Sequence, residues 1–438
     1  MSASKMTSGK LFLMVLGFLF CPLGCVSQYW DFVYDSIPSI GRQIILTHDS
    51  CYLVTCTNSG FEPGFSLKLD QSGNILWFSQ YGGYSICQTF DNKYIIAGSQ
   101  DLYAKLTKID ENGNFEWVKT YGEGNQEYFN SVIQSSDSCF IACGKSYCHE
   151  DRALSVVKTD TSGNVIWKKC TISRYFGSYN DLLEFDHNLY IVGEDEDNNS
   201  HLYTMALKLT LSGAEVWKKS YEIGYGGNGI ALTPDSDLIV AGGCSLTKMN
   251  LEGDTLWRRQ LKSLWVVCGV DVLSDSDSGY ILCGSDWTDH TDLLARFDKN
   301  GTEIWYQTYP TIDDQYSAGF ASVIYLPDDG FITCGCSNFG RDQTRLRVLK
   351  TNLAGGGFVE IPEKDHEYQN VIYPNPSDGI VFIDFNKPYI ADIFDINGKR
   401  ICSKADISEL DFNDCKKGLY IVRITYIGRS FCRKIIIK

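Results

Sequence analysis

Two runs of acidic residues are the stretches of this chain whose composition suits metal chemistry. They are Glu194–Asn198 (EDEDN) and Asp275–Gly279 (DSDSG). Carboxylate and amide oxygens are the ligands that Ca2+ prefers. The second run stands where other parts of the chain carry a plain hairpin turn, so we expect a turn there. The first run is a longer loop, and calcium is the cofactor that we leave open for it.

Paired acids are the second group that could do chemistry. Asp181 and Glu184 would suit a hydrolase or lyase if they converged with other carboxylates. The run His149–Arg152 (HEDR) lies in a loop without a recognisable partner, which favours a solvated loop. The chain has no Gly-x-Ser-x-Gly, His-Glu-x-x-His or phosphate-loop motif, and its six histidines are scattered. We therefore lean towards a protein that is not an enzyme.

The elements that would position such groups are set by a repeated hairpin. In Lys108–Trp117 (KIDENGNFEW), an aspartate opens a turn, a glycine closes it, and a tryptophan follows four residues after the glycine. Aspartate can bond the amides of its own turn, and glycine accepts the positive φ that such turns need. The Gly-x-x-x-Trp spacing recurs, and we expect its tryptophans to dock one repeat on the next: Trp77, Trp117, Trp167, Trp217, Trp257 and Trp305.

The repeats predict a β-propeller. Tryptophans from Trp30 to Trp305 recur every 40 to 50 residues, and an imperfect seventh copy at Gly355 has Val359 in place of tryptophan. Each unit reads as the tryptophan strand followed by three more short strands. Four antiparallel strands in about 45 residues are typical of a propeller blade. We predict an all-β chain with a seven-bladed propeller over residues 28–361.

Closure of this ring is expected to use both ends of the repeat region. The first unit lacks a preceding hairpin, and the last unit, after Asn338, lacks a full set of strands. We expect strands in residues 345–351 and 355–361 to pair with Trp30–Cys56. One blade would then be built from both ends, which hides open sheet edges.

Charge limits the partners. The 438 residues include 39 basic and 54 acidic side chains, which gives a net charge of −15. From residue 370 onward, 11 basic and 8 acidic side chains give +3, so residues 1–369 carry −18. A body of this charge repels phosphate backbones, and we expect no nucleic acid partner.

The first 27 residues read as an export signal. Lys5 and Lys10 precede an apolar run, Leu11–Leu23, that is short for a membrane span, and small residues follow it. We predict a signal peptide over residues 1–27 with cleavage after Ser27. Pro22 stands where a lipoprotein signal would have an aliphatic residue, so lipidation is the less favoured alternative.

The 17 cysteines do not read as a disulfide framework. Cys143, Cys283 and Cys334 take the same position in three repeats, inside apolar strands where sister repeats have Ala97 or Ala241. Cysteine there behaves as a small buried hydrophobe. Buried thiols are the favoured interpretation, with disulfides as the open alternative. No Cys-x-x-Cys pair supports a zinc site.

The end of the chain differs in kind from the repeats. A polar stretch over residues 362–370 suits a linker. Alternating apolar strands with an Asn-Gly turn then predict a small antiparallel β-sandwich over residues 371–438, and an ordinary accessory domain is one interpretation of it. Its distinctive residues are Tyr373, Pro374, Asn375, Pro376, Asn397, Gly398, Lys399, Gly418, Tyr420 and the terminal Lys438.

These residues give the tail a family resemblance. It resembles the type A C-terminal sorting domain of proteins exported by the type IX secretion system of Bacteroidota. The resemblance implies contact with the type IX machinery and translocation across the outer membrane. It also implies the usual removal of this domain, followed by attachment of the product to surface lipopolysaccharide or its release.

The repeats carry weaker resemblances. They are similar to uncharacterised propeller repeats of such secreted proteins and, distantly, to quinoprotein repeats with a Gly-x-x-x-Trp docking motif. The quinoprotein resemblance would imply a calcium-dependent dehydrogenase, often with a vicinal disulfide, but the chain has no adjacent cysteines. The spacing from Asp70 to Trp77 departs from a sialidase Asp-box by one residue in each interval. Neither enzyme function is expected.

These observations favour a secreted or cell-surface propeller that binds a glycan, a peptide or a partner protein without catalysis. Most of the aromatic residues that we can place fall on repeat positions, where packing explains them. Trp265, Trp287 and Tyr316 lie outside that register and are the candidate binding residues. The alternative is an extracellular polysaccharide hydrolase or lyase with carboxylates from several blades near the ring axis. A structural spacer is a third hypothesis.

Overall fold

The computed structural model describes most of the chain after the predicted signal. The described residues are 29–58, 64–148, 151–173, 177–196, 202–221, 226–261, 265–272, 279–286, 291–309, 319–327, 329–338, 344–355, 372–373, 377–384, 389–394, 400–405, 407–413, 415–426 and 429–438. All elements of secondary structure in these residues are β-strands. None of these residues belongs to a helix long and apolar enough to cross a membrane. Internal contacts divide the chain into two compact units, residues 1–357 and 358–438.

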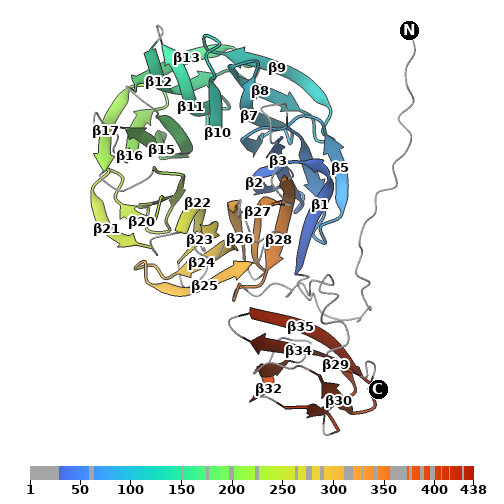
Figure 1. Ribbon diagram of the computed structural model, residues 1–438. Coiled ribbons are helices and arrows are strands. Elements are labelled where there is room, and N and C mark those ends of the chain that lie inside the picture. Colours follow the sequence, from blue (N-terminus) through green and yellow to red (C-terminus); the bar gives the residue numbers. More distant parts are fainter. Residues whose placement is uncertain are drawn as a thin grey trace, which may run out of the picture. The chain divides into compact units, whose positions relative to one another are not determined.

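The first unit is a ring of four-stranded antiparallel sheets (Figure 1). The described residues of this unit contain seven such sheets, which we number as blades 1 to 7. Blade 1 consists of β2 (Ile40–Leu46), β3 (Tyr52–Thr57), β4 (Ser66–Leu69) and β5 (Ile75–Ser79). Blade 2 consists of β6 (Ser85–Gln88), β7 (Tyr94–Gln100), β8 (Tyr103–Ile109) and β9 (Phe115–Tyr121). Blade 3 consists of β10 (Tyr128–Gln134), β11 (Phe140–Cys148), β12 (Asp151–Thr159) and β13 (Val165–Ile172).

Blades 4 to 6 follow the same plan. Blade 4 consists of β14 (Ser178–Phe185), β15 (Asn188–Glu196), β16 (Leu202–Thr210) and β17 (Glu215–Tyr221). Blade 5 consists of β18 (Gly229–Leu232), β19 (Leu238–Gly242), β20 (Ser245–Met249) and β21 (Thr255–Gln260). Blade 6 consists of β22 (Trp265–Val272), β23 (Tyr280–Asp286), β24 (Thr291–Phe297) and β25 (Glu303–Tyr309). Blade 7 contains β26 (Phe320–Leu326), β27 (Gly330–Asn338), β28 (Thr344–Thr351) and, from the start of the chain, β1 (Trp30–Pro38).

The first strand of each blade lies nearest the ring axis. The first strands β2, β6, β10, β14, β18 and β22 each pack against the first strand of the next blade, and β26 packs against β2. The last strands, such as β9 and β21, form the outer rim (Figure 1). Side chains that differ between the inner strands of neighbouring blades therefore meet around the axis.

Local hydrogen bonds shape the hairpin between the third and fourth strands of a blade. In blade 2 the Asp110 carboxylate accepts from the backbone amides of Asn112 (2.9 Å) and Asn114 (2.8 Å). Gly113 has a φ of 80°, which L side chains rarely adopt. The turn itself thus explains the aspartate and glycine of the repeat.

The repeated tryptophans contact the hairpin of the following blade. The indole Nε1 of Trp77 donates to the carbonyl of Glu111 (3.1 Å), and Trp167 and Trp217 bond the next hairpin in the same way. A methyl group added to Gly113 would lie 2.8 Å from the Trp77 ring, so glycine leaves the space that the indole needs. The remaining rings face hairpin glycines likewise: Trp117 faces Gly163, Trp257 faces Gly301 and Trp305 faces Gly355.

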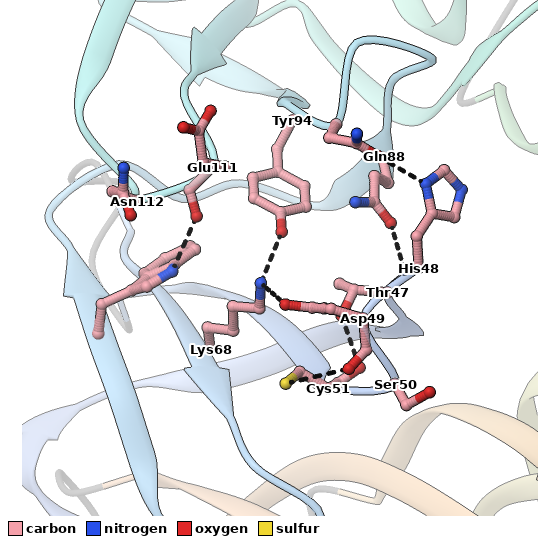
Figure 2. Close-up of polar contacts among 12 residues, drawn as sticks. Thr47, His48, Asp49, Ser50, Cys51, Lys68, Gln88, Tyr94, Glu111 and Asn112 are labelled. Atoms are coloured by element: carbon pink, nitrogen blue, oxygen red, sulfur yellow. Dashed lines mark hydrogen bonds and ion pairs between the residues drawn. The ribbon is translucent and has the colours of Figure 1, made fainter.

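Several blades also share a buried lysine on the third strand, just before the hairpin, that contacts an acidic side chain. We did not predict this contact from the sequence. In blade 1 the Lys68 ammonium donates to the Asp49 carboxylate (2.7 Å) and to the Tyr94 hydroxyl of blade 2 (3.2 Å), as Figure 2 shows. Lysines at the same position pair with other acids: Lys108 with Asp91, Lys158 with Asp137, Lys208 with Glu252, Lys248 with Asp235 and Lys350 with Asp329. Each of these buried cations has a carboxylate partner.

The sequence repeat is offset from the blade by one strand. Strand β9, which carries Trp117, pairs with β8 of blade 2, and β10 begins the next sheet. The assignment of each tryptophan strand to the same sheet as the three strands that follow it is therefore wrong. The Asp-x-x-Gly hairpin ties the tryptophan strand to the strand before it, and the chain then crosses to the next blade.

Strand β1 closes the ring. It pairs antiparallel with β28, and Trp30 lies opposite Lys350 as Trp77 lies opposite Lys68. The two ends of the repeat region do pair, but β2 and β3, which were expected in this same blade, belong to blade 1. Val359 lies outside the described residues. Trp30 supplies the outer-strand tryptophan that the last repeat lacks.

A buried ion triad holds β1 in blade 7. Arg347 on β28 donates through Nε and Nη2 to Asp31 of β1 (3.0 and 2.6 Å) and through Nη1 to Asp292 of blade 6 (2.7 Å). The side chains of Arg347, Asp31 and Asp292 are 5%, 7% and 0% exposed. Burial raises the pKa of Asp292 to about 6, and Arg347 acts in the opposite direction. The closing strand is thus tied to its own blade and to the neighbouring one.

Most cysteines in the described part of the chain are thiols, and one pair forms a disulfide. Cys143 and Cys334 are fully buried thiols, as the repeat positions indicate. Cys148 and Cys170 form a disulfide that joins β11 to β13 within blade 3. The interpretation of the cysteines as thiols is wrong for this pair. Neither residue stands at the repeated apolar position, so the pattern that indicated burial did not extend to them.

The second unit is a β-sandwich with one shared core. One sheet contains β29 (Ile372–Tyr373), β30 (Ile380–Ile383) and β33 (Glu409–Asp411), and the other contains β31 (Ile390–Phe394), β32 (Arg400–Ala405), β34 (Gly418–Tyr426) and β35 (Arg429–Ile437). Val381 of the first sheet and Val422 of the second belong to the same core. The predicted fold class, an all-β propeller followed by a small β-sandwich, is confirmed.

The residues of the sorting motif fall in different places of this sandwich. Tyr420 is buried and donates its hydroxyl to the Lys416 carbonyl (2.5 Å). The Lys438 amide donates to the Ser377 carbonyl (2.9 Å), and Tyr373 is exposed. Gly418 begins β34. The remaining motif residues lie outside the described part: Pro374, Asn375, Pro376, Asn397, Gly398 and Lys399.

Candidate functional site

The predicted binding aromatics stay a prediction. Trp265 begins β22, the inner strand of blade 6, but its side chain is outside the described part. Trp287 and Tyr316 lie outside the described residues altogether.

The acidic run at Glu194–Asn198 makes protein contacts where it is described. The Asp195 carboxylate accepts from the Ser173 hydroxyl (2.6 Å) and from the backbone amide of Glu196 (2.9 Å). Among the residues that the structure describes, no group of three or more histidine, cysteine or acidic side chains could hold a metal ion. The rest of this run and most of the second acidic run lie outside the described residues.

The paired acids Asp181 and Glu184 serve contacts between blades. They lie three residues apart on β14 and therefore point to opposite faces of the strand. Asp181 is half-buried and accepts from the Ser131 hydroxyl of blade 3 (3.0 Å) and the Ile230 amide of blade 5 (3.1 Å); burial raises its pKa to about 6. Glu184 accepts from the Ser136 amide (2.8 Å). These two carboxylates do not converge on one point.

The inner strands bring non-repeated side chains together. In β2, β10 and β14 the register shifts by one residue, which leaves Arg42, Asn130 and Asn180 as the extra residues of β-bulges. A bulged residue leaves the hydrogen-bond ladder, and its side chain is re-aimed. Tyr84 and Asn228 precede the first strands of blades 2 and 5, where their amides bond the second strand. Five blades thus place polar side chains at the start of the inner strand.

Arg42, Tyr84, Tyr128 and Lys145 form a continuous group across blades 1 to 3, which we call the cation–aromatic row. The Arg42 guanidinium carbon lies 5.1 Å from the Tyr84 ring centre, and the Tyr84 and Tyr128 ring centres are 5.7 Å apart. The Lys145 ammonium lies 6.0 Å from the Tyr128 ring centre. All four side chains are half-buried. Aromatic faces attract cations, so the row presents apolar surface and positive charge together.

Three asparagines continue this inner surface across blades 3 to 5. The Asn130 side-chain amide donates to the Tyr179 carbonyl (3.0 Å) and to the side-chain oxygen of Asn180 (3.2 Å). Asn180 donates in turn to the Gly227 carbonyl (3.1 Å) and to the side-chain oxygen of Asn228 (3.3 Å). The three amides are therefore held in place by the neighbouring blade, and all three remain partly exposed.

Glu194 borders the cation–aromatic row. Burial raises the pKa of Tyr128, with smaller contributions from Tyr84 and Glu194. Glu194 is itself half-buried, and burial raises its pKa. A methyl group on Gly226 would lie 2.5 Å from Glu194 Oε2, so the backbone of blade 5 packs on this carboxyl. A carboxyl with a raised pKa can act as a general acid, which is chemistry that a hydrolase would use.

The cation–aromatic row was not predicted from the sequence. Arg42 and Tyr84 stand at the variable place just before the apolar part of the inner strand, whereas Tyr128 begins β10 and Lys145 lies on the second strand β11. Our search followed the conspicuous Gly-x-x-x-Trp positions instead. An alignment of the repeats on their second strands would place Arg42, Tyr84, Asn130, Asn180 and Asn228 in one polar column. That column is the signal in the sequence that could have found the site.

The comparisons with known proteins identify the C-terminal unit. Residues 371–438 match the family described as "Secretion system C-terminal sorting domain". The predicted resemblance to type IX sorting domains of Bacteroidota is thereby confirmed. The protein is exported by type IX secretion to the cell surface or the extracellular space, and its C-terminal domain interacts with the secretion machinery.

No curated protein matches the chain. Among solved structures, it is similar to a protein of unknown function from Bacteroides caccae (14% identity, 59% of this chain and 94% of that one, TM-score 0.40). It is also similar to a catalytically inactive virginiamycin B lyase from Staphylococcus aureus (11% identity, 74% and 100%, TM-score 0.46). A third is a gluconolactonase from Xanthomonas campestris (14% identity, 72% and 96%, TM-score 0.38).

Proposed function

We propose that the exported ring is a noncatalytic recognition module whose ligand binds over the cation–aromatic row and the adjoining asparagines. The observation that carries this proposal is the row itself. Blade packing does not require Arg42, Tyr84, Tyr128 and Lys145, because other blades have different residues at the corresponding positions. Half-exposed tyrosines beside cations and fixed amides are typical of surfaces that bind polar ligands.

The ligand class that we propose is a glycan, with a peptide or a partner protein as the other candidates. Trp265, Trp287 and Tyr316 would extend the binding surface if their side chains reach the same end of the ring. Calcium at residues 194–198 would be an accessory to this surface.

The rival function is a polysaccharide hydrolase or lyase. The half-buried Glu194 carboxyl, whose pKa is raised by burial, favours it, because such a group could protonate a leaving oxygen beside the row. The positions of Asp181 and Glu184 on opposite faces of β14 weaken it.

The two functions are separated by measuring retention and cleavage on the same glycans. The mature protein is applied to a glycan array, and each retained glycan is then incubated with it and assayed for reducing ends and for unsaturated products. Retention without cleavage supports the recognition module. Cleavage that is lost in Glu194→Gln supports the rival.

Variants locate the site. Tyr84→Ala and Tyr128→Ala should each weaken retention, because they remove aromatic faces of the row. Tyr306→Ala, on the outer strand β25, is the matched control and should bind like the wild type. Equal retention by all three variants contradicts the proposed site.

We further propose the limits and the fate of the parts. Residues 1–27 would be removed as a signal peptide, residues 28–361 would form the ring, and residues 362–370 would link it to the sorting domain. That domain would be cleaved, and the ring would be attached to surface lipopolysaccharide or released. Mass spectrometry of the exported protein determines both ends of the product.

A further inference from the structure

We infer that the cation–aromatic row takes an anionic saccharide, a glycan whose sugars carry carboxylate or sulfate groups. This inference rests on the proposed binding function and names its ligand class.

The cations of the row have no acidic partner among the described residues. In the described part of the chain, Arg42 bonds the Thr57 hydroxyl through Nε (2.9 Å) and packs on Tyr84, and Lys145 packs on Tyr128, but neither makes an ion pair. The buried lysines of the blade hairpins each hold a carboxylate, for example Lys68 with Asp49. Blade assembly thus neutralises its own cations and leaves these two available to a ligand.

Lys105 is a third cation without an acidic partner among the described residues, and it is buried. It is 3% exposed and makes no hydrogen bond or ion pair with the residues that the structure describes. Burial lowers its pKa. A methyl group on Gly98 would lie 3.9 Å from Lys105 Cε and 3.8 Å from the Tyr84 backbone nitrogen, which places the lysine beside the row.

Comparison with blade 7 shows what Lys105 lacks. Lys105 pairs with Gly98 in blade 2 at the same register as Arg347 with Gly335 in blade 7. Arg347 is neutralised by Asp31 and Asp292. A buried cation without a counter-ion is destabilising, and an anionic ligand group would supply the missing charge.

The aromatic rings favour a saccharide over an acidic peptide. Tyr84 and Tyr128 are tilted by 47° with ring centres 5.7 Å apart, and both are partly exposed. The negative face of an aromatic ring suits the polarised C–H groups on one side of a sugar ring. Glu194 at the Tyr128 end disfavours a ligand with uniformly dense negative charge.

The net charge of −15 affects how the protein would select an anionic saccharide. At long range the acidic ring repels a polyanion, so selection of an anionic saccharide would depend on local contacts with Arg42, Lys105 and Lys145. Salt screens long-range repulsion more strongly than contacts with buried or half-buried cations, so binding should persist at moderate ionic strength.

The test is calorimetric titration of the exported protein with four probes. They are oligogalacturonate, its neutral methyl ester, a sulfated galactan oligosaccharide and a poly-glutamate peptide. The ester keeps the sugar rings and removes the charges. The same titrations are made with Arg42→Gln, Lys145→Gln and Lys105→Met, and with Lys218→Gln on the exposed outer strand β17 as the control for loss of one positive charge.

We expect at least one anionic saccharide to bind and the ester to bind about 10- to 100-fold more weakly, the range for losing hydrogen bonds to charged groups. Arg42→Gln and Lys145→Gln should each reduce affinity by about tenfold or more, and Lys218→Gln should not. Lys105→Met should lower affinity while raising the melting temperature of the free protein. A merely structural lysine would instead lower both.

Different failures have different meanings. If the ester binds as tightly as oligogalacturonate, the anionic ligand class is wrong and the recognition function stands. If only poly-glutamate binds, the saccharide class is wrong. If Lys105→Met does not fold, Arg42→Gln and Lys145→Gln still decide, and unchanged affinity in both overturns the inference. If no glycan on the array and no probe is retained by the wild type, the inference and the proposed recognition of a glycan both fail.

Discussion

Replacing Arg347 with methionine tests how the ring is closed. The substitution keeps much of the side-chain volume and removes the cation shared by Asp31 and Asp292. Breaking a buried ion pair by removing one partner costs about 3–5 kcal/mol. For a ring of about 330 residues this corresponds to a fall in melting temperature of about 4–7 °C. Lys218→Met on the exposed outer strand is the control and should change little.

The destabilisation should depend on pH. Burial raises the pKa of Asp292 to about 6, so this carboxyl favours the folded state when it is protonated. That contribution is present at low pH and is lost as pH rises through the folded pKa. Arg347 opposes the loss in the wild type. The variant should therefore lose more stability at pH 8 than at pH 5.

The measurement is thermal unfolding by circular dichroism at both pH values. A triple variant, Arg347→Met with Asp31→Leu and Asp292→Leu, should recover much of the loss, because an apolar replacement of a buried ion network is often tolerated. The reasoning would be refuted if Arg347→Met melted within a degree or so of the Lys218→Met control at both pH values.

Three further predictions concern other parts of the chain. Burial raises the pKa of Asp181 to about 6, so wild-type stability should fall between about pH 4.5 and 7.5 by about 2 kcal/mol relative to Asp181→Asn, and parallel denaturation curves would contradict this. Trp167→Phe keeps a ring but loses the bond to Leu211 (3.1 Å), so urea unfolding should show a loss of about 1 kcal/mol, against about 3–5 kcal/mol for Trp167→Ala. Deleting residues 371–438 should abolish surface or extracellular protein in fractionated cells, and normal export of the truncated chain would be inconsistent with the sorting role.

The sequence predicted the parts of the fold that depend on neighbours along the chain. In the hairpin around Gly113, the aspartate bonds amides two and four residues away, so spacing alone identifies the turn. The tryptophan four residues after the glycine repeats for a related reason, since each blade meets the next in the same way. The sorting domain was recognisable because its motif residues occur in order over one short stretch.

The sequence was less informative about which strands pair with each other. It placed each tryptophan strand in the wrong sheet, because a repeat has the same spacing whichever strand is counted first. It also placed β2 and β3 in the closing blade. Only the register of Trp30 against Lys350 shows that a single N-terminal strand completes blade 7.

By itself, then, the sequence determined the repeat, the all-β class and the route of export, because these depend on local hydrogen bonds, periodicity and a contiguous motif. The tertiary structure decided which charges are neutralised and which are not. Arg347 forms an ion pair with Asp31, which lies more than 300 residues away in the sequence. Lys105, at the corresponding position of its blade, pairs with no acid among the described residues. It also joined Arg42 to Lys145 through two tyrosines of different blades. Counter-ions and binding surfaces depend on distances in space, which the order of residues along the chain does not contain.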